Sequence, residues 1–93
     1  MRRLLLRSNS FIRTARRMVK KYSHIAEDVE AALELLSNDA FYPFLKTHKL
    51  KGDLEGSWAC SISYDLRAVF KFVQYEESEA ILLETIGTHD EVY

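Results

Sequence analysis

The sequence predicts an α+β fold in which an N-terminal helix hairpin packs on a small, largely antiparallel, twisted sheet. Two observations predict this fold. Apolar residues recur at helical spacing between positions 8 and 37, whereas three short apolar stretches follow position 57. The resulting order, β-α-α-β-β-β, places consecutive strands side by side as a meander, with the helices on one face. The 93 residues suit a single domain, 1–93.

The first part of the chain is expected to form one short strand and two helices. Residues 2–7 suit the strand, and the serine and asparagine side chains at 8–10 can cap a first helix. Ser23 is expected to cap a second helix that ends near Ser37. The break between the helices is so short that they should form an antiparallel hairpin. The apolar stripe of the first helix is Phe11, Ala15, Met18, Val19 and Tyr22, and that of the second is Ile25, Val29, Ala32, Leu33 and Leu36.

The second part of the chain is expected to be a loop followed by three strands. Residues 40–56 contain Pro43, Gly52 and Gly56 and have the composition of a loop. The strands are expected at 58–63, 66–73 and 81–86, with a turn at Glu76, Glu77 and Glu79 between the last two. Such a sheet would leave the face opposite the helices open for a functional site.

Charge along the chain is strongly segregated although the net charge is only −1. Residues 1–22 carry eight basic side chains and no acidic one, and residues 23–45 carry five acidic side chains and no lysine or arginine. Four of the basic residues share one face of the first helix, at Arg13, Arg16, Arg17 and Lys20. Such a stripe is either a solvated face or a nucleic-acid contact.

Cysteine use and hydropathy favour a cytoplasmic protein without a membrane segment. Cys60 is the sole cysteine, so no internal disulfide can form. It alternates in phase with Trp58 and Ile62, which indicates a core position and not a nucleophile. The apolar run Leu4–Leu6 is too short for a signal peptide, and no stretch is long enough to span a bilayer.

Four polar residues of the second part of the chain suggest chemistry. Arg67 breaks an otherwise apolar strand, and Asp65 would share its face if the strand extended that far. This pair is either a phosphate-binding arginine beside a carboxylate or an ion pair that covers the sheet. His48, flanked by lysines, and His89, just past a strand end, are either acid–base groups or ordinary surface histidines. The histidines and Cys60 lack metal-ligand spacing, so no metal or other cofactor is predicted.

Three blocks of the C-terminal half, taken in order, resemble the RelE/YafQ family of toxin ribonucleases. The first is His48-Lys49-Leu50-Lys51-Gly52, followed by Leu54 and by Gly56-Ser57-Trp58. The second is Tyr64-Asp65-Leu66-Arg67-Ala68-Val69-Phe70, and the third is Ile86-Gly87-Thr88-His89-Asp90-Glu91-Val92-Tyr93. The N-terminal half matches the family only through its helix hairpin and its basic first helix.

The resemblance implies a RelE-like fold and an activity. Members of the family cleave mRNA, most of them in the A site of the 30S ribosomal subunit, without a metal, and a cognate antitoxin wraps and blocks the toxin. Positions that look catalytic in YafQ-like members correspond to His48, Asp65 and His89, and those of RelE-like members to Arg67 and Tyr93. The residues expected to bind RNA are Lys49, Lys51, Arg13, Arg16, Arg17 and Lys20.

The sequence also departs from both family patterns. Ser61 or a neighbour stands where YafQ has a further histidine, and Ala59 and Ser61 stand where RelE carries lysines. The base and the acid would then come from His48, His89, Asp65 or Tyr93. Two alternatives share the fold: a ParE-type protein that inhibits DNA gyrase without cutting nucleic acid, and an inactive toxin that only binds its antitoxin.

Overall fold

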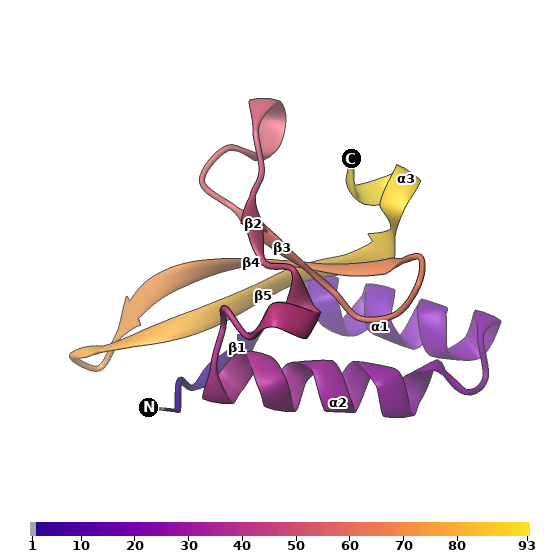
Figure 1. Ribbon diagram of the computed structural model, residues 1–93, viewed down its shortest axis with the longest axis horizontal. Helices are drawn as coiled ribbons and strands as arrows, with labels where there is room; N and C mark the ends of the chain where they lie inside the picture. The colour runs from indigo at the N-terminus through magenta and orange to yellow at the C-terminus, as the bar shows by residue number, and fades with distance from the viewer. Residues whose placement is uncertain (1) are drawn as a thin grey trace.

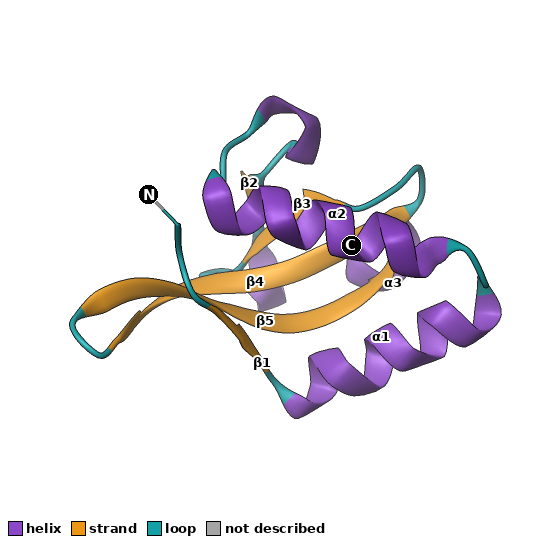
Figure 2. Ribbon diagram, turned by 90° about the horizontal axis from the view of Figure 1, so that it is seen from below, coloured by secondary structure: helices purple, strands orange, loops and turns teal. Residues whose placement is uncertain are grey.

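The structure, a computed structural model, describes residues 2–93 and has two layers. Two helices cover one face of a five-stranded sheet (Figures 1 and 2). The strand order is β1-β5-β4-β3-β2, and every neighbouring pair is antiparallel except β1 and β5, which are parallel. The elements are β1 (Leu5–Arg7), α1 (Asn9–Lys21), α2 (Ile25–Asn38), β2 (His48–Lys49), β3 (Trp58–Ser61), β4 (Leu66–Tyr75), β5 (Ser78–Thr88) and α3 (His89–Val92).

Both helices form where their apolar spacing predicts them, but only α1 has a side-chain cap at its start. The Ser8 hydroxyl accepts the Phe11 N–H at 3.0 Å, as expected for a helix N-cap. The expected Ser23 cap of α2 is wrong, because the helix begins at Ile25 and no side chain caps it. The Ile25 N–H instead donates to the Tyr22 carbonyl at 3.0 Å, so the turn between the helices satisfies this amide without a cap.

The main core lies between the helices and the sheet. Phe70 of β4 and Ile81 and Leu83 of β5 are fully buried, and Leu36 of α2 packs against the same cluster. Cys60 and Trp58 belong to this side of the sheet, as their alternation predicts. Strand β1 is shorter than the expected 2–7, because the Arg3 N–H leaves the sheet and donates to the Ser37 carbonyl at the end of α2.

Two short elements and several strand bounds differ from the expected ones. The predicted loop 40–56 contains β2, which pairs with β3 through His48 opposite Ala59. Strand β5 extends at both ends beyond 81–86, and the turn before it uses Glu76 and Glu77 in the left-handed conformation. Helix α3 follows β5 directly. With two and four residues, β2 and α3 are too short to show a periodic pattern.

The sheet face opposite the helices is only partly open. A second, smaller core of Leu50, Ala59, Val69 and Val92 lies on this face, where α3 and the segment after β2 cover the strands. The face is therefore less open than expected, and Arg67 and Lys71 are among its residues that stay partly exposed. Within residues 2–93, no helix combines the length and the apolar character needed to cross a membrane.

Candidate active site

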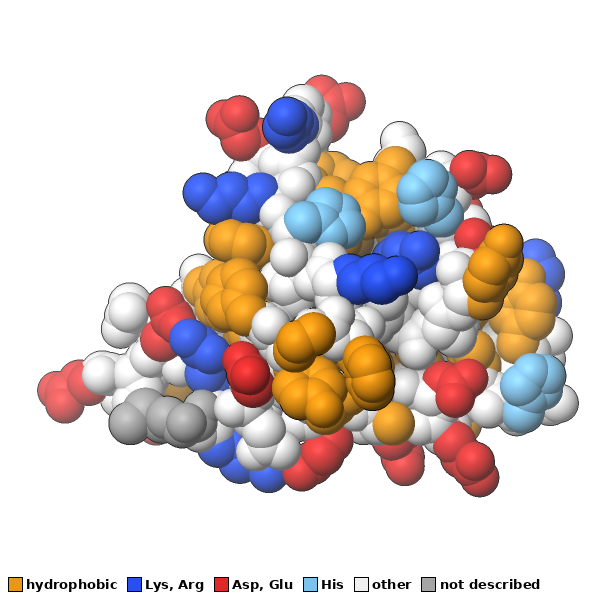
Figure 3. Space-filling view, in the orientation of Figure 1, with side chains coloured by type: hydrophobic (Ala, Val, Ile, Leu, Met, Phe, Trp, Pro, Cys, Tyr) orange, Lys and Arg blue, Asp and Glu red, His pale blue; other side chains and the backbone are white. Residues whose placement is uncertain are grey.

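The last residue of the sequence contacts both histidines of the predicted site. The Tyr93 hydroxyl lies 2.6 Å from His48 Nε2, and the two rings stack with their centroids 5.5 Å apart. The His89 ring lies on another side of Tyr93, at a centroid distance of 4.5 Å. Figure 3 shows two pale blue histidines with hydrophobic side chains between them and blue lysine or arginine atoms below them.

Hydrogen bonds define the tautomer of His48. Its Nδ1 lies 2.9 Å from the Lys46 carbonyl oxygen, which can only accept a hydrogen bond. Nδ1 therefore carries the proton, and Nε2 presents the lone pair that accepts the Tyr93 hydroxyl. The basic nitrogen of His48 thus faces the remaining candidate groups.

Arg67 lies beside this pair and braces the turn between β3 and β4. Its Nη1 donates to the carbonyl oxygens of Leu66 and Ser63 at 3.0 and 3.1 Å, and to that of Tyr64 at 3.3 Å. All three bonds use one nitrogen, so Nη2 and Nε keep N–H groups for an anion. Arg67 is close enough to the Tyr93 hydroxyl to act on its pKa.

Tyr93 remains a protonated phenol at neutral pH. Partial burial raises its pKa above the ordinary value, although the positive charge of Arg67 and a hydrogen bond to Arg67 oppose the rise. The hydroxyl is therefore a hydrogen-bond donor, which agrees with its donation to His48 Nε2.

A network centred on α3 positions His89 and Tyr93. The Thr88 N–H donates to Glu91 Oε1 at 2.8 Å, and the Glu91 N–H donates to the Thr88 hydroxyl at 3.3 Å, which completes a capping box. The Thr88 N–H, with help from Arg17 at 3.4 Å, holds the pKa of the Glu91 carboxyl below its usual value. Gly87 permits this close packing, because a Cβ there would lie 3.1 Å from Glu91 Oε1. Sequence reasoning missed this network, although Thr88-x-x-Glu91 is the usual signature of a capping box.

Asp65 does not belong to the strand of Arg67, the position in which it would have shared the face of this arginine. Strand β4 begins at Leu66, so Asp65 lies in the turn before the strand and not in the strand itself. Its side chain is exposed, and no ion pair joins it to Arg67 within the described residues. Asp65 contributes through its backbone, whose carbonyl accepts the His89 N–H at 2.9 Å.

The predicted RNA-binding residues form two groups, one beside the site and one on a face of α1. Beside the His48–Tyr93 pair lies a shallow pocket of about 560 Å³, whose lining includes Lys49 and Lys51. The predicted basic face of α1 is exposed and lines a second shallow depression with Arg13, Arg16, Arg17 and Lys20. Among residues 2–93, no three histidine, cysteine, aspartate or glutamate side chains are grouped so as to hold a metal ion.

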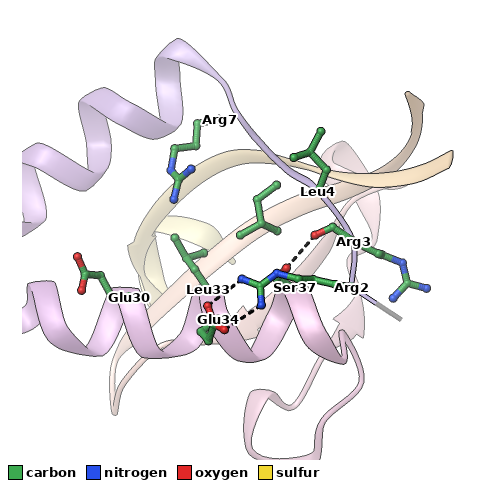
Figure 4. A pocket seen from close by; sticks show the side chains of 9 residues that line it. Arg2, Arg3, Leu4, Arg7, Glu30, Leu33, Glu34 and Ser37 are labelled. Atoms are coloured by element: carbon green, nitrogen blue, oxygen red, sulfur yellow. Dashed lines mark hydrogen bonds and ion pairs between the residues drawn. The ribbon is translucent and has the colours of Figure 1, made fainter. Parts of the chain in front are cut away.

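A larger cavity lies away from these residues. It measures about 710 Å³, lies between β1 and α2, and is crossed by the ion pair of Arg2 with Glu34 (Figure 4). The predicted site residues do not line it. We therefore place the candidate active site at the junction of β2, β4 and α3, where His48, Arg67, His89 and Tyr93 meet.

Comparison with known proteins identifies the family. Residues 3–93 match the family model described as the bacterial toxin of type II toxin–antitoxin systems, YafQ. YafQ from Escherichia coli BL21(DE3) superposes with a TM-score of 0.77 at 17% identity over 98% of both chains. The YoeB/ParE toxin from Agrobacterium tumefaciens gives 0.74 at 17% identity over 92% of this chain and 98% of that one.

A chain of the Escherichia coli DinJ–YafQ toxin–antitoxin complex gives a TM-score of 0.75 at 18% identity, over 100% of this chain and 99% of that one. A comparison with curated protein sequences gives no match. The solved structures show a shared RelE/YafQ-like fold, and the family model matches almost the whole sequence. The chain is therefore a member of the YafQ toxin family of bacterial type II toxin–antitoxin systems.

Proposed function

We propose that this toxin is an endoribonuclease that acts in the cytoplasm and cleaves mRNA in the A site of the 30S ribosomal subunit, which stops translation. One observation carries the proposal: His48 and Tyr93, from distant segments, form a hydrogen bond of 2.6 Å beside Arg67 and His89. Two imidazoles, a phenol and a guanidinium at one surface point provide what RNA cleavage requires. A protein that only binds a partner needs no such set.

The proposed reaction uses the nucleophile that RNA itself carries. The 2′-hydroxyl oxygen attacks the adjacent phosphorus, and the bond from phosphorus to the 5′-oxygen of the next nucleotide breaks. A base takes the proton of the 2′-hydroxyl, and an acid gives a proton to the departing 5′-oxygen. The products are a 2′,3′-cyclic phosphate and a free 5′-hydroxyl. No metal or other cofactor enters this scheme.

We assign the base to His48, because its bond to the Lys46 carbonyl leaves Nε2 free to accept a proton. The substrate hydroxyl takes the place of the Tyr93 hydroxyl on Nε2, and Tyr93 then packs against the neighbouring nucleotide. His89 is the acid. Arg67 binds the phosphate through the nitrogens that the turn does not use. Asp65 positions His89 through its backbone carbonyl.

The proposed partner is a cognate antitoxin. The exposed basic face of α1 and the open part of the sheet suit an acidic, amphipathic segment of such a protein. Expression of the chain with its neighbouring gene should yield a complex that copurifies through high-salt washes. A toxin recovered alone and monomeric from cells that express both genes would contradict this partner.

Cleavage is tested by primer extension on ribosome-bound mRNA. Arg67→Ala, His48→Ala and His89→Ala should each lower the cleavage rate by about 10²-fold or more, because each removes a group that acts on the transition state. The His48 and His89 effects should combine less than additively if both act on one step. The reaction should survive a chelator and leave a 2′,3′-cyclic phosphate.

His24→Ala is the matched control, because His24 is exposed at the start of α2 and is the histidine that does not contact Tyr93. Its activity should equal that of the wild type, and circular dichroism should show that every variant is folded. Full activity of Arg67→Ala and His89→Ala would contradict the nuclease assignment. Gyrase inhibition without any mRNA cleavage by the wild type would place the protein with the ParE-type toxins.

A further inference from the structure

The segment between α2 and β2 presents aromatic rings to solvent. Phe44 is 78% exposed, Phe41 54% and Tyr42 37%, which is unusual for large apolar side chains in a small domain. Residues 40–52 also contain three lysines and no acidic residue. Exposed aromatic rings interleaved with cations are typical of surfaces that bind single-stranded nucleic acid.

Packing holds these rings in place. Phe41 contacts Trp58 edge-on at 5.4 Å and stacks on Phe72 at 5.9 Å, while Tyr42 and Phe44 meet edge-on at 5.6 Å. Leu45 anchors the segment in the main core, and the Thr47 hydroxyl donates to the Ala40 carbonyl. The backbone that carries the rings therefore needs little ordering when a ligand binds, which favours affinity.

The segment is joined directly to the candidate active site. The Lys46 carbonyl that accepts the His48 Nδ1–H belongs to it, and Phe44 lies four positions before His48. An extended stretch of that length spans at most about 14 Å. Edge strand β2 presents His48 on the side of Ala59, whereas the Lys49 ammonium lies 5.5 Å from the Trp58 ring. A single-stranded RNA that crosses β2 would therefore pass from the catalytic groups to the exposed aromatic rings.

We propose that Tyr42 and Phe44, with Lys46 and Lys49, form a stacking platform for the bases of single-stranded RNA beside the cleaved bond. This inference rests on the proposed nuclease function and adds a second subsite to it. Phe44 projects from the surface, as its exposure indicates, and offers a flat face on which any base can stack. A polypeptide side chain would instead need a groove in which to become buried, so the geometry favours a base as the occupant.

The test uses the full chain and an mRNA whose A-site codon carries 2′-deoxy nucleotides, so that it is bound and not cut. The mRNA is presented both free and on the ribosome, with the flanking nucleotides either intact or abasic. Phe44→Ala should weaken binding to the intact mRNA by about 10-fold, as expected for the loss of one stacked base. The same substitution should have no effect on the abasic mRNA, because no base remains to stack.

Substitutions at Phe44 separate stacking from simple apolar contact. Phe44→Trp should bind as well as the wild type, whereas Phe44→Leu, which keeps apolar volume without a flat ring, should behave like Phe44→Ala. Tyr75→Ala is the matched control, because Tyr75 is also exposed but lies at the β4–β5 turn. It should bind both forms of mRNA like the wild type.

Three results would overturn the stacking platform. The first is equal binding of Phe44→Ala and the wild type to intact mRNA, and the second is a wild type that binds neither form of mRNA. The third is a Phe44→Ala defect that is confined to antitoxin capture. The proposed function fails separately, when the wild type binds mRNA through Phe44 but never cleaves an all-ribose message.

Discussion

Cys60 of β3 illustrates how burial controls the chemistry of one side chain. Its removal from solvent raises the pKa of the thiol to about 12, whereas an unfolded cysteine titrates near about 8.5. Because the thiolate is the reactive form, 5,5′-dithiobis(2-nitrobenzoate) should label the folded protein at pH 8 at least about 10³-fold more slowly than the protein in urea. The same difference disfavours folding as the pH rises above about 8.5, because only the unfolded state can then release the proton.

Absorbance at 412 nm follows the labelling, and Cys60→Ala gives the background. Rapid labelling of the native protein would contradict the buried position of Cys60.

Arg67 and Asp65 mark how far single residues could be assigned from the sequence. The type of Arg67 predicted a polar surrounding, since an arginine inside an apolar strand needs one, but it left open whether the arginine binds phosphate or pairs with a carboxylate. Its three bonds to the β3–β4 turn could not be predicted, because they depend on the path of the backbone at residues 62–65. Strand β4 begins at Leu66, one residue after Asp65, and a strand boundary cannot be predicted to a single residue, so the sequence did not show that Asp65 lies in the turn.

Helix α3 shows the same limit for whole elements. Helices α1 and α2 are 13 and 14 residues long, so the periodicity of their apolar stripes was visible in the sequence. A helix of four residues has no such pattern, and its existence depends on a capping box and on packing over Gly87. The contact of His48 with Tyr93 depends in turn on α3. The sequence therefore identified the candidate residues but did not predict that these two are in contact.

Loss of the α3 cap should affect activity more than stability. Thr88→Ala removes one half of the capping box, a change that costs about 1 kcal/mol in typical helices. Because α3 is one turn long, the loss should unfold it locally and lower mRNA cleavage by about 10-fold, while the thermal midpoint changes by a few degrees. Cleavage assays and thermal unfolding measure the two effects.

Ser8→Ala is the matched control, because it removes the equivalent cap of α1 far from the site. It should lower stability by a similar amount and leave the cleavage rate unchanged. Equal losses of activity in the two variants would disprove a specific role of α3.

The basic face of α1 should contribute salt-dependent binding to ribosomal RNA. Arg17 is left unsubstituted in this test, because it also forms an ion pair with Glu91 and its loss would disturb α3. Replacement of Arg13, Arg16 and Lys20 by glutamine should weaken ribosome binding and lower the slope of log affinity against log salt by about two to three. Arg2→Gln, which affects contacts with Glu34 and Asn38 of α2, should leave the slope unchanged. An unaltered slope in the triple variant would leave α1 as a solvated face.

The stability of the whole molecule depends mainly on the core between the helices and the sheet, because both helices pack on the same side. Leu83 of β5, which lies between β1 and β4, is fully buried in it. Leu83→Ala should lower the free energy of unfolding by about 2–5 kcal/mol, a large part of the roughly 5–15 kcal/mol that a small domain possesses. Urea unfolding measures the loss. Leu54→Ala, at a position that is 39% exposed, should lower the free energy of unfolding by much less.

The parallel pairing of β1 with β5 determines when the protein can fold during its own synthesis. Leu5 pairs with Ile81, which a translating ribosome adds 76 residues later. Until β5 has left the exit tunnel, the nascent helices have no complete sheet to pack on, and Tyr93 emerges later still. The groups around His48 therefore meet only after Tyr93 has left the exit tunnel, so we expect the nascent toxin to be inactive until that point.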